Sequence, residues 1–405
     1  MKEKFLLIQG LRAYACTLVV LAHLFFCMGE VYHFHFLMSN VDFGALGVIQ
    51  FFFISGFVIT MVAMRESRFE FIVKRFFRIF PPIFFSLLLI VATYVLCHLT
   101  HTMQFIEANS WKTHVFPGLR LWNELKVGEF FKNLFLAGVG MNGVMWTLVV
   151  ESTFYVLVFL FLPVLKQNPV QLYTSIGSIF GLWYILKRCD MGGVIEQIQH
   201  YGYDTFFGAA LTHGDRAFLL DVIYLILGSL FYLWYAKKIK HISFVVLSVL
   251  FLILLIKEWG HYSGPYAWYL WLSYGLLVLS VYLNNRLRVP QWLVSLGNIS
   301  YSVYLNHMVL GVILMNAILF YIGVSFSKFM FAFLAACLLA VLVSIVSYKY
   351  IEVPSQRLAR NLIREASSAR FAVRVPLYVG SFVPFLMFLI YPLCKFLIFM
   401  CKVYL

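Results

Sequence analysis

Charged residues are scarce in this chain of 405 residues: Asp, Glu, Lys and Arg together make up 12% of it, whereas 62% is hydrophobic. The mean hydropathy is +0.88. A soluble domain has no room to bury so much apolar surface, so lipid must surround most of the chain. The composition therefore predicts an all-α polytopic membrane protein.

Acidic residues are the rarer charge, with 17 Asp and Glu against 31 Lys and Arg and a formal net charge of +14. Such an excess can indicate nucleic-acid binding, but the basic residues here cluster in short loops between apolar stretches. That placement is typical of loops on the cytoplasmic side of a membrane. We therefore expect the lipid bilayer, and no nucleic acid, as a partner.

Metal-ligand spacing is also missing. The seven cysteines lie mostly inside apolar stretches and are interpreted as small hydrophobic residues. His33 and His35 form a pair in a loop, but no third ligand follows nearby, so we predict no metal site. We expect no cleavable signal peptide, because the first apolar stretch is long and contains Arg12, which is typical of a retained span.

About eleven apolar runs are long enough to cross a bilayer. With the N-terminus inside and alternating crossings, most of the basic residues fall on the inner side, which predicts a cytoplasmic N-terminus and an outer C-terminus. The expected spans lie near residues 8–28, 44–64, 79–99, 144–165, 171–187, 217–235, 242–257, 265–283, 297–322, 329–351 and 374–401.

The C-terminal part differs in character from the rest. The segment 352–375 is basic and amphipathic, with Arg357, Arg360 and Arg364 at helical spacing, and we interpret it as a cytoplasmic helix on anionic headgroups. The last span follows it as an addition to the preceding ten. We therefore divide the chain into a transmembrane domain over 1–355 and a linker helix with an additional span over 356–405.

Arg12 and His23 are the first unexpected ionisable residues, because both stand in one apolar span. Eleven residues separate them, which places them within about 20° of one helix face and ~16 Å apart along the axis. Ionisable groups inside a membrane usually face the bundle interior and have a function. The alternative is an arginine that reaches the interface and a histidine hydrogen-bonded in the core.

Glu151 is the one acidic residue well inside an expected span, and Tyr155 follows it by one helical turn. The expected boundaries place Glu151 and His23 at a comparable depth. A carboxylate that orients an imidazole is the usual way to build a general base. We therefore predict a His23–Glu151 pair, with a purely structural buried pair as the alternative.

Arg75 and Arg78 stand in KRFFRIFPP at the cytoplasmic start of the third span. Being three apart, they share a helix face, and two guanidinium groups side by side can clamp phosphate. Ordinary anchoring at the cytoplasmic surface is the alternative. We expect the pair Pro81–Pro82 to set the start of the helix.

Further polar residues inside the spans are candidates for lining a pocket or stabilising an oxyanion. The segment 296–310 places Ser300 and His307 seven apart, on one face, with Asn306 beside the histidine. Ser55 lacks the turn expected around a nucleophilic serine. The candidate pocket residues are Ser55, Trp146, Tyr155, Ser300, Tyr301 and His307.

Taken together, these motifs resemble the acyltransferase-3 family of integral membrane acyltransferases, in the family's order over roughly residues 5–355. Asn306 departs from the apolar residue that many members have before the histidine. The matching residues are Arg12 and His23; Gly47, Val48, Phe51, Phe52, Ser55, Gly56 and Phe57; Arg75 and Arg78; Trp146, Glu151, Phe154 and Tyr155; Leu296, Gly297, Ser300, Tyr301, Tyr304, Leu305 and His307; and Glu352, Val353 and Pro354.

The resemblance implies ten family spans and transfer of an acyl group, most often acetyl, from cytoplasmic acyl-coenzyme A. The acceptor is a hydroxyl of a cell-envelope carbohydrate or a related molecule, such as a lipid-linked saccharide, and the location is a bacterial inner membrane. Acyl-coenzyme A is a donor substrate, so no permanently bound cofactor is expected. We expect a stand-alone form without the fused extracytoplasmic SGNH domain of some members. The acceptor then enters the bundle, or a separate extracytoplasmic protein completes the transfer.

The expected mechanism combines the buried ionisable residues with the family resemblance. Arg75 and Arg78, together with Arg12, hold the coenzyme A phosphates, and His23, oriented by Glu151, takes the proton of the acceptor hydroxyl. A covalent acyl-histidine relay is a second route. The competing class is a secondary transporter with a buried Arg/His/Glu proton relay, but the sequence lacks the inverted repeats and broken helices that this class predicts.

Overall fold

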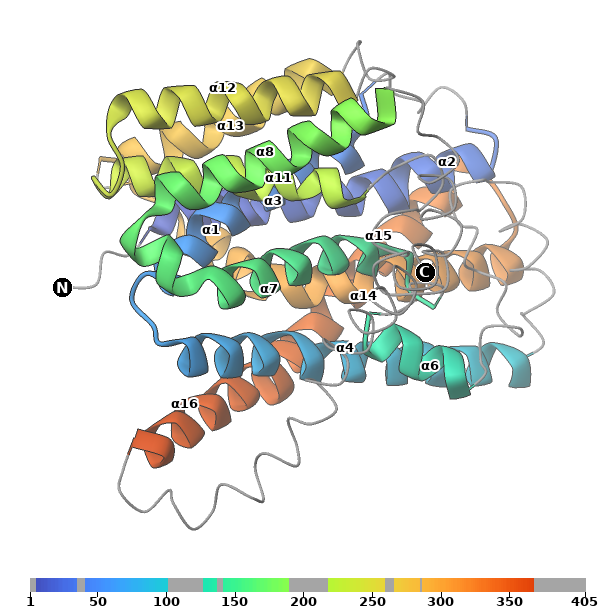
Figure 1. Ribbon diagram of the computed structural model, residues 1–405. Helices are drawn as coiled ribbons and strands as arrows, with labels where there is room; N and C mark the ends of the chain where they lie inside the picture. Colours follow the sequence, from blue (N-terminus) through green and yellow to red (C-terminus); the bar gives the residue numbers. More distant parts are fainter. Residues whose placement is uncertain are drawn as a thin grey trace, which may run out of the picture.

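The computed structural model describes residues 5–34, 41–100, 127–136, 141–188, 218–258, 266–284 and 286–367. All regular elements in these ranges are helices, and the long ones lie side by side in a bundle (Figure 1). In chain order they are α1 (Leu6–Val20), η1 (Leu21–Cys27), α2 (Met28–Val31), α3 (Phe43–Ala63), α4 (Arg68–Leu99), α6 (Val127–Leu134), η3 (Gly143–Met145), α7 (Trp146–Gln167), α8 (Pro169–Arg188), α11 (Phe218–Tyr235), α12 (His241–Glu258), α13 (Tyr266–Tyr282), α14 (Gln291–Ile322), α15 (Phe326–Ser347), η5 (Tyr348–Glu352) and α16 (Val353–Ser367).

Six helical segments in these ranges are long and apolar enough to cross a membrane. This confirms the all-α class and a multi-pass membrane protein, whereas the count of about ten spans stays a prediction. The expected last span, 374–401, lies outside the described residues. The six segments are Leu6–Val31, Phe43–Ala63, Arg68–Leu99, Gly143–Gln167, Gln291–Ile322 and Phe326–Ala366, and shorter apolar helices cover Asp221–Tyr235, His241–Ile256 and Trp268–Tyr282.

The centre of the bundle consists of α1, α3 and α14. Helix α1 packs against both α3 and α14, α3 packs against α11, and α14 packs against α15. At the lower edge of Figure 1, α16 lies beside α4, where Ala359 and Ile363 contact Val73. Since α1, α3 and α14 carry Arg12, Ser55 and Tyr301, their packing helps to decide where the site lies.

Glycines allow the central helices to approach each other closely. A Cβ atom added to Gly56 of α3 would lie 2.0 Å from the carbonyl oxygen of Leu225 in α11, and one added to Gly297 of α14 would lie 2.1 Å from the carbonyl oxygen of Gln9 in α1. Small residues at helix interfaces are the usual way to bring helices together in lipid, where the hydrophobic effect between helices is absent.

Helix α4 starts earlier than the sequence predicts. Ser67 caps it, since its side chain accepts from the backbone N–H of Glu70 while the Glu70 carboxylate accepts from that of Ser67. The expectation that Pro81 and Pro82 set the start of the helix is therefore wrong, and both prolines lie inside it.

Pro81 has no N–H for the carbonyl group four residues earlier, that of Phe77. The hydroxyl of Ser355 in α16 donates to this Phe77 oxygen at 2.8 Å. The freed carbonyl is thus satisfied by a side chain from another helix, which ties α16 to α4.

The close approach at Gly56 leads to a first prediction. Gly56→Ala forces α3 and α11 apart, and we expect it to lower the free energy of unfolding by about 1–3 kcal/mol. The measurement is the thermal unfolding midpoint of the purified full-length protein in detergent. Gly275→Ala is the matched control, because no atom lies within 4 Å of the added Cβ at that position of α13. Equal midpoints for the two variants would contradict the close packing.

Candidate active site

Residues from the separate sequence motifs line one cavity inside the bundle, with a volume of about 90 Å³. Helices α1, α3, α4, α7 and α14 all contribute to its wall. Its apolar wall comes mainly from α3, including Val48 and Phe51. The polar lining residues are Gln9, Arg12, Ser55, Arg75, Arg78, Thr147, Glu151, Tyr155, Tyr301 and Tyr304.

Arg75 is the most buried of the three arginines and is held from several sides. Its guanidinium carbon lies 5.3 Å from the ring centroid of Phe71 and 5.5 Å from that of Tyr155. A guanidinium nitrogen lies 3.9 Å from a carboxylate oxygen of Glu66. Cation–π contacts and a carboxylate together stabilise a buried guanidinium, so Arg75 is a fixed positive charge in the cavity wall.

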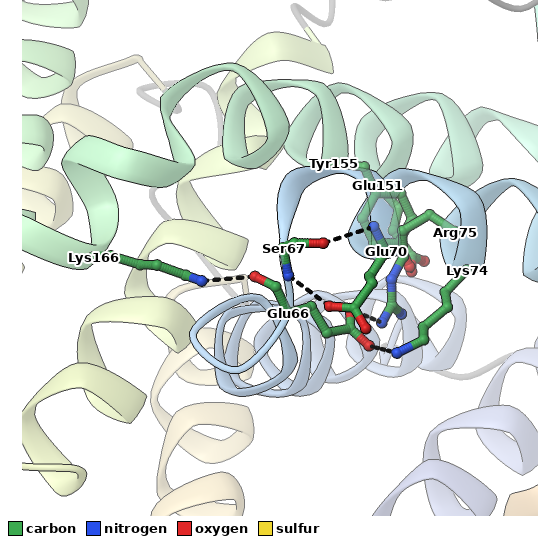
Figure 2. A network of polar contacts seen from close by, with 8 residues as sticks. All are labelled: Glu66, Ser67, Glu70, Lys74, Arg75, Glu151, Tyr155 and Lys166. Carbon is green, nitrogen blue, oxygen red and sulfur yellow. Dashed lines mark hydrogen bonds and ion pairs between the residues drawn. The ribbon is translucent and has the colours of Figure 1, made fainter. Parts of the chain in front are cut away.

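Glu66 joins the ends of two helices next to this arginine (Figure 2). Lys74 donates to its carboxylate at 2.6 Å, and Lys166 of α7 donates to its backbone oxygen at 2.6 Å. Glu66 was not predicted as a site residue, because a glutamate in a charged loop has the signature of a solvated residue.

Arg12 and Arg78 are less constrained than Arg75. Both are partly exposed and line the cavity, and neither forms an ion pair within 4 Å with the residues that the structure describes. Arg12 donates to the side-chain oxygen of Gln9 at 3.4 Å. Glu151 lies within electrostatic range of both guanidinium groups. The two arginines can therefore bind a further anion, as guanidinium groups do with phosphate.

Glu352 is a second carboxylate within electrostatic range of Arg12 and Arg78. It is buried in η5, where the hydroxyl of Ser302 donates to it at 3.1 Å and the amide of Gln356 at 3.3 Å. No role beyond its motif was predicted for Glu352 from the sequence. The available signal was an acidic residue directly after the apolar stretch 329–351.

Glu151 differs from its predicted position. Its carboxylate accepts a hydrogen bond from the hydroxyl of Tyr155, one turn further along α7, and it faces the arginines of the cavity. His23 is hydrogen-bonded to His307. The predicted His23–Glu151 pair is therefore replaced by two separate pairs.

The depth of the residues explains this difference. Thr147 of α7 bonds to the hydroxyl of Tyr304 at 2.8 Å, which aligns the two helices at this level. From there Glu151 lies one turn along α7 towards the arginines, and His307 lies about one turn along α14 in the opposite direction. With 1.5 Å per residue, the carboxylate and the histidine pair are about 10 Å apart along the bundle.

The histidine pair connects η1 to α14. Nδ1 of His23 lies 2.8 Å from Nε2 of His307, and the two ring planes are 19° apart with centroids separated by 5.1 Å. His307 is fully buried, whereas His23 is partly exposed. His23 lies in a π-helical turn, a local widening of the helix that is frequent at functional sites.

Tyr304 separates the cavity from this pair. It lines the cavity, its hydroxyl contacts Thr147 and the carbonyl oxygen of Val144, and its ring centroid lies 5.9 Å from that of His307. The cavity thus ends one aromatic ring short of the histidines.

The candidate pocket residues divide into two groups. Ser55, Tyr155 and Tyr301 line the cavity, whereas Trp146, Ser300 and His307 are not among its lining residues. The ring of Trp146 packs edge-on against Phe52, and the hydroxyl of Ser300 donates to a backbone oxygen of its own helix. Trp146, Ser300 and His307 therefore pack around the site and do not line the cavity.

A cavity with three guanidinium groups inside apolar helices is typical of a membrane protein that binds an anionic molecule. The family comparison makes the class more specific. Residues 6–349 match the family model described as "Acyltransferase domain", so the chain belongs to the acyltransferase-3 family.

Among curated proteins, the chain is similar to Nodulation protein 10 of Rhizobium leguminosarum bv. viciae, with 27% identity over 156 residues. The match covers 37% of this chain and 42% of the relative, so it spans less than half of the relative's length. No solved structure matches the chain.

The bond between Tyr155 and Glu151 is open to a direct test. Tyr155→Phe keeps the ring beside Arg75 but removes the donor to the carboxylate, and we expect a loss of about 1.5–3 kcal/mol in the free energy of unfolding. The thermal midpoint in detergent measures this loss. Tyr282→Phe, at an exposed tyrosine of α13, serves as control. A Tyr155→Phe midpoint equal to that of the control would show that the bond contributes nothing to stability.

Proposed function

We propose that the protein transfers an acyl group, acetyl in the simplest case, from cytoplasmic acyl-coenzyme A to a hydroxyl of a cell-envelope carbohydrate or related acceptor. The observation that carries this proposal is the convergence of Arg12, Arg75 and Arg78 on one cavity in a chain of an acyltransferase family. The location that fits is a bacterial inner membrane, with the N-terminus in the cytoplasm and the C-terminus outside.

The negative charge of the proposed donor matches the positive charge of the cavity. Coenzyme A carries a pyrophosphate and a 3′-phosphate, and planar guanidinium groups bind such oxygens with two parallel hydrogen bonds. Arg12 and Arg78 supply these groups, while Arg75, already held by Glu66 and two rings, supplies a fixed positive field. Glu151 and Glu352 balance part of the charge while the donor is absent.

The transfer step needs a base for the acceptor hydroxyl. In our proposal His23 takes the hydroxyl proton while the oxygen attacks the thioester carbonyl carbon, the C–S bond breaks, and the thiolate of coenzyme A leaves with the proton. The acyl end of the donor must pass Tyr304 to reach His23. An acyl-histidine at His23 remains the second route, and it moves the acyl group outward without the coenzyme.

The acceptor approaches from the outer side in this scheme, because Arg12 of α1 and His23 of η1 lie at different depths along the first helical segment. It either enters the bundle itself or is served by a separate extracytoplasmic transfer protein. A secondary transporter with the same buried charges would move its substrate without consuming acyl-coenzyme A, so release of free thiol distinguishes the two classes.

The donor site predicts the effect of single arginine changes. Arg78→Gln and Arg12→Gln each remove a charge-assisted contact to phosphate, and we expect the KM for acetyl-coenzyme A to rise about 10- to 100-fold. The assay is thiol release by the purified protein in lipid nanodiscs. Arg364→Gln, on the exposed face of α16, is the control and keeps the wild-type KM. An unchanged KM in both cavity variants would rule out donor binding there.

The role of His23 is tested in membranes. His23→Ala removes the base, and we expect transfer of radiolabel from acetyl-coenzyme A into envelope polysaccharide to fall at least about 100-fold at equal protein level. The label is measured in the polysaccharide fraction after exhaustive washing. Wild-type incorporation by the variant would contradict the proposed chemistry, and no incorporation by the wild-type protein would contradict the proposed acceptor class.

A further inference from the structure

The hydrogen bonds of His307 determine which of its nitrogens carries hydrogen. Its Nδ1 lies 2.9 Å from the carbonyl oxygen of Tyr304 and 3.1 Å from that of Val303. A carbonyl oxygen only accepts, so Nδ1 must be the donor. A neutral imidazole has a single N–H, and therefore Nε2 of His307 carries the lone pair.

The position of hydrogen on His23 follows in the same way. Its Nδ1 lies 2.8 Å from Nε2 of His307, and since that atom is an acceptor, Nδ1 of His23 is the donor. The lone pair of a neutral His23 is then on Nε2, away from the pair. The hydrogen bonds thus run in one direction, from His23 through His307 to the backbone of α14.

Burial distinguishes the roles of the two rings. His307 is fully buried and uses both nitrogens within the protein, whereas His23 is partly exposed. Gly311, one turn after His307, lets the side chain of Leu24 approach α14, since an added Cβ would lie 2.7 Å from a Leu24 methyl carbon. The close packing of η1 on α14 holds His23 against His307.

We propose that His307 is a positioning residue that fixes the tautomer of His23 and thereby makes Nε2 of His23 the atom that accepts the hydroxyl proton. This inference rests on the proposed function. As the acceptor oxygen bonds to the thioester carbon, its proton moves to Nε2, the C–S bond breaks, and the leaving thiolate takes the proton from Nε2. His307 takes the place that a carboxylate has in a Ser-His-Asp triad, with a backbone carbonyl behind it.

The first test is independent of activity. In nitrogen-15 NMR spectra of the full-length protein in lipid, labelled at histidine, His23 and His307 are assigned by loss of their signals in His23→Gln and His307→Gln. We expect hydrogen on Nδ1 and a lone pair on Nε2 in both rings. Hydrogen on Nε2 of His23 would overturn the inference, whatever the enzyme does.

The second test separates positioning from packing. His307→Gln keeps an acceptor for Nδ1 of His23, and we expect the Nδ1–H tautomer and activity within about 10-fold of wild type. His307→Phe removes the acceptor, and we expect kcat for acetyl-coenzyme A to fall about 100-fold with an unchanged KM. Asn306→Leu, at the neighbouring buried position, is the control and keeps the wild-type tautomer and kcat.

The outcomes of the two tests are distinguishable. Wild-type kcat in His307→Phe would refute the positioning role, and so would equal losses in His307→Gln and His307→Phe. Absence of turnover in the wild-type protein together with the expected tautomers would refute the proposed function while leaving the hydrogen-bond direction intact.

Discussion

The structure depends on how three guanidinium groups are kept inside a bundle of apolar helices. A positive charge in such surroundings is costly unless carboxylates, rings or polar groups compensate it. Arg75 is compensated by Glu66 and two aromatic rings, whereas Arg12 and Arg78 face Glu151 and Glu352 without a close ion pair among the described residues. In our account, an anionic donor binds to Arg12 and Arg78 because these two arginines, unlike Arg75, have no close carboxylate partner among the described residues.

The site has two parts arranged along α14. The arginines and Glu151 line the cavity on one side of Tyr304, and the histidine pair lies on the other. Glu352 is bound to Ser302, two residues before Tyr304 in α14. Tyr304 is anchored through its hydroxyl to Thr147 and Val144, so the boundary between the two parts is itself held in place by hydrogen bonds. In our account this boundary keeps a phosphate-bearing donor apart from the base until its acyl end passes the ring.

Much of the site could be predicted from the sequence because ionisable residues are so rare in apolar spans. Arg12, Arg75, Arg78, Glu151 and Tyr155 stood out for this reason, and all of them line the same cavity. The positions of the helices were likewise clear from apolar length, as for Phe43–Ala63. The early start of α4 was missed because Pro81 and Pro82 indicated a helix start, whereas the helix begins at the capping box of Ser67 and Glu70. The sequence alone does not show that Ser355, from another helix, satisfies the carbonyl group of Phe77.

The pairing of residues from different helices was harder to predict. The expected span ends fix the depth of Glu151 and of His23 only to within a few residues each. Since each residue rises 1.5 Å along a helix, the errors of two spans together can separate an expected pair by about two turns. Glu66 lies in a charged loop, where an acidic residue gives no signal, and the position of Glu352 directly after the apolar stretch 329–351 does not indicate which residues it contacts. The His23–His307 bond depends on the close packing of η1 on α14, which no local pattern encodes.

The most direct measurement of the central claim is a structure of the protein in lipid nanodiscs with the ketone analogue of acetyl-coenzyme A, in which a methylene group replaces the thioester sulfur. Our account predicts the phosphates within hydrogen-bond distance of Arg12 and Arg78, and the acetyl end directed past Tyr304 towards Nε2 of His23. An analogue bound elsewhere, or bound in this cavity with its phosphates away from both arginines, would contradict the account.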